Sequence, residues 1–424
     1  MKKFLTMTAL GTIMMVSQAN ASGFYLKEQS VAALSNAFAG ATAGAEDISY
    51  SYFNAAGLTR HKGTKFTVGG TYIAPRSKAK HSEAELPPMG SGGTDNERYH
   101  DNIVHAAVAP HMYFSHQIND QWTVGASLNV PFGMITKYDD EWAGRYHGTM
   151  SKVTTVTVTP MAAYKATDKL SLGAGFQMQY IKARLRNSAL IPTSPTSFIE
   201  DRSIVEGDTF DIGYQLGALY EFNDATRVGV GYRSEMKHKL KGDIEFSNSM
   251  VASMLNQDVT ARLTTPASLT LGIYHDLNDK WAVMGEYGRT FWSSFDELRI
   301  VGQKGLNSVT EERWKDTSFW ALGVSYKYDD KWKFRAGIAY DQGAVNEEYR
   351  TPRIPDAGRQ WYSGGVQYTQ NENMTWNLGY TYIRAKDGRV ALRGDHTGDD
   401  ARGSLNALYK NDIHIVGLSL NYNF

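Results

Sequence analysis

Several signatures are missing from this sequence, and each absence narrows the choice of fold. Its 424 residues include no cysteine, which excludes a disulfide framework and thiol chemistry. Beyond the N-terminus there is no apolar run of about 18 residues or more, which excludes a membrane protein built from helices. The 44 basic residues balance the 44 acidic ones, so no strong field of one sign argues for a nucleic-acid partner.

Signatures of catalysis are missing too. The 11 histidines, for example His111, His116 and His275, stand in no nucleophile motif and at no metal-ligand spacing. The 40 glycines are spread along the chain at strand spacing and form no phosphate-binding loop. We therefore expect no metal, no cofactor and no enzymatic activity.

The N-terminus carries an export signal. Lys2 and Lys3 precede an apolar stretch from Phe4 to Val16, and Ala19-Asn20-Ala21 follows as a small-x-small cleavage site. Residues 1–21 are therefore predicted to be a secretory signal peptide, and Ser22 to be the first residue of the exported chain.

Strict alternation of apolar and polar residues is the strongest pattern in the rest of the chain. From Trp122 to Val130, and again from Leu170 to Tyr180, every second residue is apolar and the residues between are small or polar. Such period-two runs of about ten residues are typical of strands that cross an outer membrane with one face toward lipid. Fourteen runs are predicted, at roughly 65–74, 104–115, 122–130, 154–164, 170–180, 210–222, 227–241, 265–277, 281–292, 317–328, 332–341, 360–369, 374–384 and 412–424.

The connections between these runs alternate in length. Short turns built on Asn and Asp recur, and three of them lead into Trp122, Trp281 and Trp332, which suits an aromatic girdle at a membrane surface. Long polar segments lie between the short turns, and the chain ends on Phe424. A soluble β-sandwich explains the alternation but not this combination. We expect an all-β, antiparallel transmembrane barrel of about 14 strands in a Gram-negative outer membrane, with short turns in the periplasm and long loops outside.

The segment before the barrel has a different pattern. Residues 22–62 do not alternate, and Val31, Leu34 and Phe38 repeat at helical spacing among small side chains. Because a 14-stranded barrel is too wide for its own side chains to fill, we predict a helical hatch over 22–62 inside a barrel over 63–424. A periplasmic linker or an ordinary short helix is the alternative.

Particular residues resemble the FadL family of long-chain fatty acid and hydrocarbon transporters, and the likeness spans essentially the whole exported chain. They are Ser22-Gly23-Phe24, Ala39-Gly40, Tyr52-Phe53-Asn54-Ala55-Ala56-Gly57-Leu58, Tyr232-Arg233-Ser234-Glu235, Trp332 to Asp341 and Arg353-Ile354-Pro355-Asp356. One departure is that the family usually has Asn-Pro-Ala where this chain has Asn54-Ala55-Ala56, which puts the gate geometry there in doubt.

The resemblance implies uptake of a hydrophobic small molecule, which is captured by outer loops, held in an apolar pocket and released sideways where the third strand kinks. The sequence has no clear N-terminal box for a periplasmic energy-transducing partner, so passive uptake is the hypothesis. It implies a ligand-binding hatch end at Ser22, Gly23 and Phe24, and gate residues at Asn54, Ala55, Ala56, Pro131, Phe132 and Gly133. Proline removes a ladder donor and glycine weakens a strand, so a wall can open there. The alternative is that Pro131 only ends its strand.

Charged residues fall into three groups. Lys182, Arg184 and Arg186 follow the lipid-facing phase and are expected to meet lipopolysaccharide phosphates. Arg313 and Lys315 are possible partners for a ligand carboxylate. A structural network bracing the hatch is predicted for the charges on the lumen phase, which are Asp211, Arg233, Glu235, Lys237, Glu286 and Arg335.

The rival function is a general diffusion porin, which would need an open, charge-lined channel. An additional adhesin role for the long loops stays open. We expect a monomer in contact with membrane lipid and lipopolysaccharide. Fatty acids, alkanes and monoaromatic hydrocarbons all suit an apolar pocket, and the sequence does not choose among them.

Overall fold

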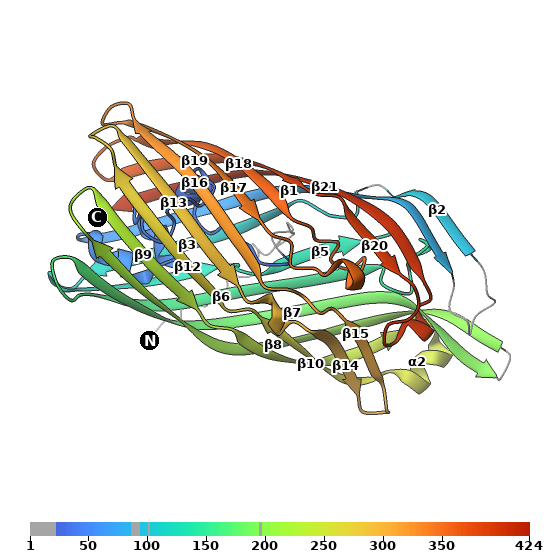
Figure 1. The fold of residues 1–424 in the computed structure, drawn as a ribbon. Coiled ribbons are helices and arrows are strands. Elements are labelled where there is room, and N and C mark those ends of the chain that lie inside the picture. Colours follow the sequence, from blue (N-terminus) through green and yellow to red (C-terminus); the bar gives the residue numbers. More distant parts are fainter. Residues whose placement is uncertain (1–22, 86–93, 101, 195–196) are drawn as a thin grey trace, which may run out of the picture.

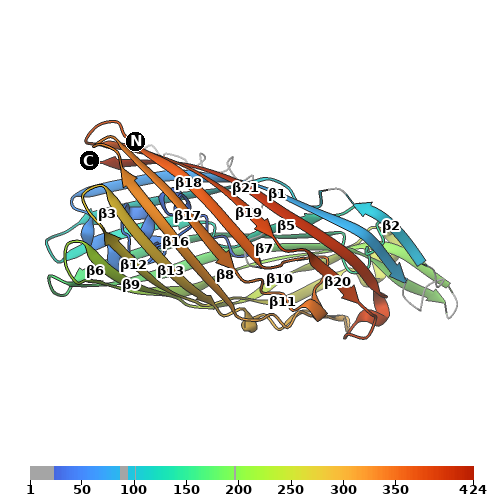
Figure 2. The same ribbon diagram turned by 45° about the horizontal axis from the view of Figure 1, so that its top comes forward.

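The computed structural model describes residues 23–85, 94–100, 102–194 and 197–424, so the predicted signal peptide and Ser22 lie outside the described residues. The strands close into an antiparallel barrel of 14 strands, which confirms the predicted fold class. Both views show the N-terminal segment inside the ring, near the end that carries the C-terminus (Figures 1 and 2). In the described residues no helix is both long and apolar enough to cross a membrane.

The ring closes because each strand pairs with the next and the last pairs with the first. Its members are β1 (Thr64–Glu85), β3 (Ala107–Gln117), β4 (Trp122–Asn129), β6 (Met150–Lys165), β7 (Leu170–Ser194), β8 (Ser197–Glu221), β9 (Thr226–Arg233), β12 (Ser268–Asp276), β13 (Trp281–Thr290), β16 (Thr317–Lys327), β17 (Trp332–Asp341), β18 (Arg359–Thr369), β19 (Met374–Ala385) and β21 (Leu405–Asn423).

Shorter elements complete the wall and loops. The further strands are β2 (Thr94–His100), β5 (Gly133–Lys137), β10 (Met236–Phe246), β11 (Gln257–Thr265), β14 (Glu297–Gly302), β15 (Asn307–Glu311) and β20 (Gly388–Leu392). The helices are α1 (Val31–Leu34), η1 (Ile48–Tyr52), η2 (Ala55–Arg60), α2 (Ser249–Leu255), η3 (Trp292–Ser294), η4 (Glu347–Tyr349) and η5 (Asp399–Ala401).

Three of the short turns share one construction. In each, a side-chain oxygen accepts a hydrogen bond from the backbone N–H of a tryptophan three residues later, at 2.8 Å for Asn119 and Trp122, 3.0 Å for Asn278 and Trp281, and 2.7 Å for Asp329 and Trp332. The three tryptophans are exposed on the outer face and each packs on a tyrosine of the neighbouring strand. The predicted turns and aromatic girdle are confirmed, and Asx-turn geometry is the reason.

The predicted strand over 227–241 is wrong in one respect. Its chain forms β9 and β10, and pairing with β8 moves by one residue between the two, from Arg233 opposite Gln215 to Lys241 opposite Asp208. A one-residue shift exchanges the two faces of a strand. Glu235 and Lys237, predicted to face the lumen, are therefore exposed on the outer surface, where they pair at 3.1 Å.

The hatch lies directly on the barrel wall because the wall carries glycine where the hatch backbone approaches. A Cβ added at Gly217 would lie 2.0 Å from Asn54 Oδ1, one at Gly173 would lie 2.2 Å from the backbone nitrogen of Ala56, and one at Gly337 would lie 2.0 Å from a backbone oxygen of the hatch. No side chain fits at such distances. The helical part is shorter than the periodicity predicted, since α1 ends at Leu34 and Ala37 and Phe38 have positive φ.

Candidate functional site

The third strand of the barrel is interrupted. Its pairing with β3 ends at Met112 and Leu128, and the same register resumes where Val104 bridges Thr136. The strand keeps its other neighbour, β6, on both sides of the break. We call this interruption the wall opening, and its two edges are residues 105–111 and 129–135.

The start of the hatch occupies one edge of the wall opening. We call residues 23–29 the hatch tip and residues 30–62 the hatch body. The Leu26 N–H donates to the Pro131 carbonyl at 2.8 Å, and the Gly133 N–H donates to the Phe24 carbonyl at 2.9 Å. Tyr25 forms an antiparallel bridge with Phe132. The tip thus satisfies backbone groups that the interrupted strand would otherwise present unpaired.

Aromatic rings surround Phe24, which is 1% exposed. Its ring centroid lies 4.9 Å from that of Trp292, 5.8 Å from Phe132 and 5.9 Å from Trp314. Gly23 has φ +62°, and a Cβ there would lie 2.3 Å from the Trp314 ring, so only glycine fits at this position. Phe24 and Phe132, both predicted site residues, are therefore in contact.

An apolar cavity lies beside Phe24, on the side of the hatch that faces the long loops. It is lined by inward-facing residues of the extended strands, among them Val153, Ala183, Leu240, Leu263 and Ile300. Its volume is about 60 Å³. The cavity is therefore narrow, and its wall offers a ligand mainly hydrophobic contact.

Three charged residues belong to this lining, Glu206, Glu312 and Arg353, and Glu206 already faces Lys182 and Arg184. Glu312 is 2% exposed and accepts a hydrogen bond from the Trp314 indole at 3.0 Å; burial raises its pKa to about 7. The Arg353 guanidinium donates to Ser151 Oγ at 3.0 Å and to Asn187 Oδ1 at 3.3 Å. Burial lowers the pKa of Arg353 to about 10, so it stays cationic at neutral pH.

The two basic residues singled out for a ligand carboxylate lie elsewhere. Arg313 is exposed, pairs with Glu311 at 2.7 Å and covers the Tyr349 ring, and Lys315 is also exposed. Neither lines the cavity. Arg353 belongs to the family-like motif Arg353-Ile354-Pro355-Asp356, but its place in the cavity was not predicted. The sequence of a loop does not show which of its side chains turn inward.

The loop that carries Arg353 also holds the hatch tip. Asp356 Oδ2 accepts hydrogen bonds from the Gly23 N–H at 3.2 Å and from the Ala344 N–H at 3.0 Å, and its other oxygen pairs with Arg359. Only two residues, Ile354 and Pro355, lie between the cavity arginine and this attachment. A shift of the loop at Arg353 would therefore act directly on the tip.

Asn54, Ala55 and Ala56 fasten the hatch body to the wall. The Asn54 side-chain amide donates to the Thr42 carbonyl at 2.8 Å and to the Ala218 carbonyl of β8 at 2.9 Å. Its oxygen accepts from the Ala56 N–H at 3.0 Å and so caps η2. Ala55 is the first residue of that helix, a position where proline is tolerated because its N–H has no partner in the helix.

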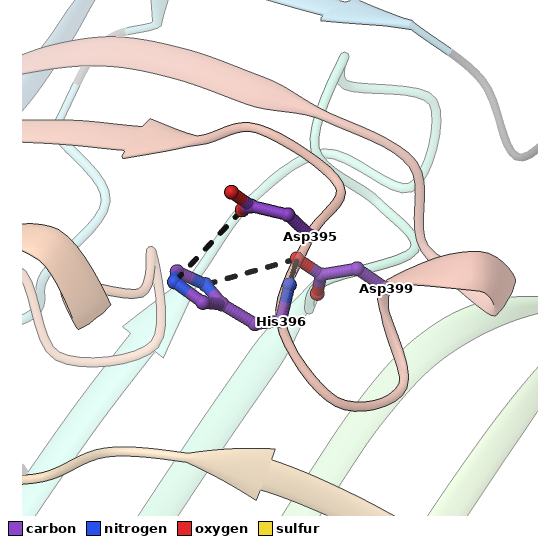
Figure 3. Close-up of side chains that lie close together, drawn as sticks. All are labelled: Asp395, His396 and Asp399. Carbon is purple, nitrogen blue, oxygen red and sulfur yellow. Dashed lines mark hydrogen bonds and ion pairs between the residues drawn. The ribbon is translucent and has the colours of Figure 1, made fainter.

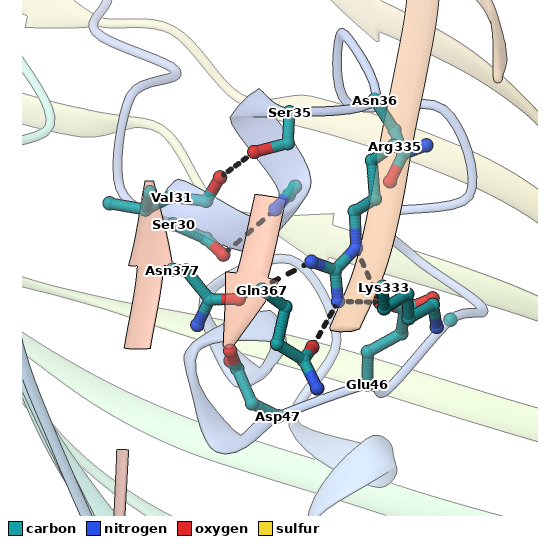
Figure 4. A network of polar contacts seen from close by, with 12 residues as sticks. Ser30, Val31, Ser35, Asn36, Glu46, Asp47, Lys333, Arg335, Gln367 and Asn377 are labelled. Carbon is teal, nitrogen blue, oxygen red and sulfur yellow. Dashed lines mark hydrogen bonds and ion pairs between the residues drawn. The ribbon is translucent and has the colours of Figure 1, made fainter. Parts of the chain in front are cut away.

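A buried ion network braces the body (Figure 4). Glu46 lies 2.8 Å from Lys333 Nζ and also pairs with Arg335, which donates to Gln367 at 2.6 Å. Burial alone would raise the pKa of Glu46, but Arg335 and Lys333 hold it well below its usual range. Three of the charges predicted to brace the hatch do contact it: Arg335 pairs with Glu46, Glu286 accepts from the Thr42 N–H, and Arg233 donates to the Tyr52 carbonyl. Asp211 contacts His238 of the wall and not the hatch.

One group of side chains in the described loops resembles a metal-ligand set. His396 lies 4.0 Å from an Asp395 oxygen and 3.8 Å from an Asp399 oxygen (Figure 3). Asp399 already accepts a hydrogen bond from the His396 N–H at 3.2 Å and faces Arg402, so it holds the fold of its own loop. The expectation that no metal is required stays a prediction.

The chain matches a family of known proteins over almost its whole length. Residues 12–424 match the sequence model of a family described as outer membrane protein transport protein (OMPP1/FadL/TodX). The chain is 32% identical to outer membrane protein P1 of Haemophilus influenzae over 472 aligned positions, covering 100% of both chains. It is 31% identical to a long-chain fatty acid transport protein of Escherichia coli, covering 89% of this chain and 90% of that one.

Two solved structures share the fold. A FadL homologue of Pseudomonas aeruginosa superposes with a TM-score of 0.85 at 23% identity, covering 95% of this chain and 100% of that one. The toluene transporter TbuX of Ralstonia pickettii superposes with a TM-score of 0.69 at 21% identity, covering 96% and 99%. At these identities the likeness concerns the architecture alone.

Proposed function

Since the chain belongs to the OMPP1/FadL/TodX family of outer membrane transport proteins, we propose that it carries long-chain fatty acids passively across the outer membrane. The observation that carries this proposal is the narrow apolar cavity, which has a half-buried cation, Arg353, in its lining and the hatch tip below. Burial of each methylene contributes about 0.8 kcal/mol, so an acyl chain strongly prefers such a cavity to water.

Capture would begin at the outer loops. The short helix α2 exposes Met250 and Met254, which are 51% and 59% exposed on the same side of the helix. Methionine side chains adapt to flexible apolar ligands. From there the acyl chain would enter the cavity, and its carboxylate would pair with Arg353. This pairing favours a fatty acid over an alkane or a monoaromatic hydrocarbon, which have no anionic group.

Release would follow when the hatch tip leaves the wall opening. Two charged residues of the tip are poorly satisfied where they lie: Lys27 packs on the Phe319 ring at 4.3 Å, and Glu28 has one carboxylate oxygen without a hydrogen-bond partner. Burial raises the pKa of Glu28 to about 7. Displacement would hydrate both groups and open the edges of the wall, so the ligand could leave sideways without crossing a water-filled channel. Pro131, Phe132 and Gly133 would then form the gate, and Asn54, Ala55 and Ala56 its fixed support.

A general diffusion porin is less consistent with the lumen. The hatch body lies against glycines of β7, β8 and β17, and its buried ions are paired across to the wall, which leaves little room for a hydrated solute. The family consists of transporters, and we propose no catalytic role. We also propose a monomer surrounded by lipid, because the 14 strands of the ring pair with one another within a single chain.

The test compares two ligands in proteoliposomes that contain the purified protein. Radiolabelled oleate and radiolabelled hexadecane differ in the carboxylate, so Arg353→Gln should slow oleate uptake about tenfold and leave hexadecane uptake nearly unchanged. Arg313→Gln is the matched control and should affect neither. High ion conductance without saturable oleate uptake by the wild type would support the porin instead.

A further inference from the structure

A row of basic side chains crosses the outer face of the barrel near its extracellular end. Lys239 of β10 lies directly opposite Arg262 of β11, and Arg262 lies directly opposite Arg299 of β14. Directly opposed residues point to the same face of a sheet, with Cβ atoms about 5 Å apart. All three side chains are exposed to a substantial degree. We call these three residues the cation row.

The cation row has too few acidic partners. Arg299 pairs with Glu297 at 2.6 Å, whereas the side chains of Lys239 and Arg262 make no hydrogen bond or ion pair within the described chain. Like charges placed directly opposite each other on neighbouring strands destabilise a sheet. A row of this kind is favourable only when an anion from outside the chain lies against it.

The neighbouring row shows how the same wall looks when its charges are balanced. One step further along β10, Lys241 lies opposite Asp208 of β8, and Asp208 lies opposite Lys182 of β7. Lys182 also pairs with Glu206 at 2.5 Å. Here cation and anion alternate across three strands, so the row needs no external partner.

The position of the cation row selects among anions. It lies at the border of the lipid-facing surface, where Tyr180 and Phe210 are 39% and 59% exposed. Tyr180 comes two residues before Lys182, and Phe210 comes two residues after Asp208. In Figure 1, β10 and β14 lie toward the end of the barrel remote from the C-terminus. This end carries the long loops, which are expected to face outside. An anion at this height is the headgroup of a lipid in the outer leaflet.

We propose that the cation row binds a phosphate group of lipopolysaccharide, with the acyl chains of the same lipid against the exposed aromatic residues below. The Arg262 guanidinium matches a phosphate in bidentate geometry and Lys239 adds a point charge. Arg299, oriented by Glu297, closes the row on the far side. This site is separate from the transport route, since Ala261 and Leu263, which flank Arg262, face the cavity on the opposite side of the wall.

Lys182, Arg184 and Arg186, which were expected to meet lipopolysaccharide phosphates, differ from the cation row. Lys182 and Arg184 both face Glu206, and Arg186 pairs with Asp140 at 2.6 Å. These three cations already have acidic partners within the chain. The lipopolysaccharide contact is therefore assigned to the unpaired cations of β10 and β11.

The experiment titrates the purified full-length protein with lipid A that carries both phosphates and, separately, with lipid A from which the phosphates have been removed, and counts bound lipid by native mass spectrometry. The double variant Lys239→Gln, Arg262→Gln should bind phosphorylated lipid A about tenfold more weakly, because charge-assisted hydrogen bonds are lost. Lys182→Gln should bind as the wild type does. Dephosphorylated lipid A should bind weakly to all three proteins.

Three results would overturn the proposal: equal binding of both lipids by the wild type, unchanged binding by the double variant, or displacement of lipid A by inorganic phosphate at similar concentrations. The last would indicate a site for free anions. A heat-resistant folded band on gels and an unchanged rate of oleate uptake show that the double variant is folded. Oleate uptake is also the separate readout of the transport function, so failure of one proposal leaves the other untouched.

Discussion

The hatch tip and the hatch body belong to one continuous segment, but they are attached to the barrel in different ways. The body is fixed by close backbone contact with wall glycines and by the buried pair of Glu46 and Arg335. The tip is held by a few backbone hydrogen bonds along an interrupted strand and by aromatic contacts around Phe24. Its own charged residues, Lys27 and Glu28, lack ion pairs in the described chain.

This difference in attachment distinguishes the hatch body, as a structural plug, from the hatch tip, as the part that we expect to move. Removing the body would expose paired charges and leave the wall glycines without contacts, whereas removing the tip would hydrate groups that are poorly satisfied where they lie. We therefore expect the body to stay in place while the tip exchanges between two positions. Four measurements test the comparison, in order of decreasing effect.

The largest effect is expected when the ion network of the body loses its acid. Glu46→Gln leaves Arg335, which is 4% exposed, without its anion, and breaking a buried pair in this way costs about 3–5 kcal/mol. The free energy of unfolding in urea should fall by that amount and ion conductance should rise. Glu28→Gln is the matched substitution in the tip and should change stability by less than about 1 kcal/mol. Equal losses in both variants would contradict the division into tip and body.

A smaller effect is expected at Gly23. Gly23→Ala combines a left-handed backbone, which costs about 1–2 kcal/mol for other residues, with a collision against the Trp314 ring. The tip should detach, and protease should cleave it in the folded protein. Gly63→Ala has a similar positive φ of +71° but no atom within 4 Å of its added Cβ, so it should lose only the backbone term and keep the tip protected. Protection of the tip in Gly23→Ala would show that the aromatic cluster tolerates displacement.

The affinity of the cavity for a fatty acid should depend on pH through Glu312. Because burial raises its pKa to about 7, this carboxyl is neutral at pH 6 and charged at pH 8, where it repels a ligand carboxylate bound to Arg353. Affinity for oleate should fall by up to about tenfold between these values, whereas Glu312→Gln should bind tightly at both. The raised pKa of Glu312 also makes the folded state less stable as pH rises from the usual carboxyl pKa toward 7. The reason is that Glu312 loses its proton at a lower pH in the unfolded chain than in the folded protein. A pH profile unchanged by Glu312→Gln would assign the dependence to another group.

The smallest effect is expected at Ala55, where the family usually has proline. Ala55 is the first residue of η2, and Asn54 before it has φ −153° and ψ 104°, which is compatible with a following proline. Ala55→Pro should raise the free energy of unfolding by about 0.5–1 kcal/mol through the unfolded chain and leave uptake unchanged. Ala56→Pro would remove the N–H that Asn54 caps, so it should destabilise the protein. A destabilising Ala55→Pro would show that the hatch has repacked around alanine.

Much of the architecture could be predicted from local pattern. Alternation identified the strands because each side of the wall meets a different solvent, and the turns were readable because Asn119, Asn278 and Asp329 form a local hydrogen-bonded structure with the residues that follow. The phase error at Glu235 and Lys237 has an equally local cause. A one-residue shift in pairing exchanges inside and outside, and no residue type announces it.

The candidate site was less predictable. Phe24, Pro131, Phe132 and Gly133 were named from the resemblance, and the structure brings them together, but their roles in release remain proposals. The cavity cation could not be chosen from the sequence, because Arg313 and Arg353 both stand in long polar loops. Only the smaller exposure of Arg353 and its hydrogen-bond partners distinguish the two.

Sequence alone determined what each stretch of chain can be: a strand with a lipid face, a tight turn with a girdle tryptophan, or a small-residue segment that fits within a lumen. These properties depend on neighbours a few residues apart, so composition and period are enough. Tertiary structure decided which backbone edge stays unpaired, which glycine contacts the hatch, which arginine lines the cavity and which cations of the outer face have no acidic partner. Those outcomes depend on the register between strands far apart in the chain, where a shift of one residue exchanges the partners of every side chain.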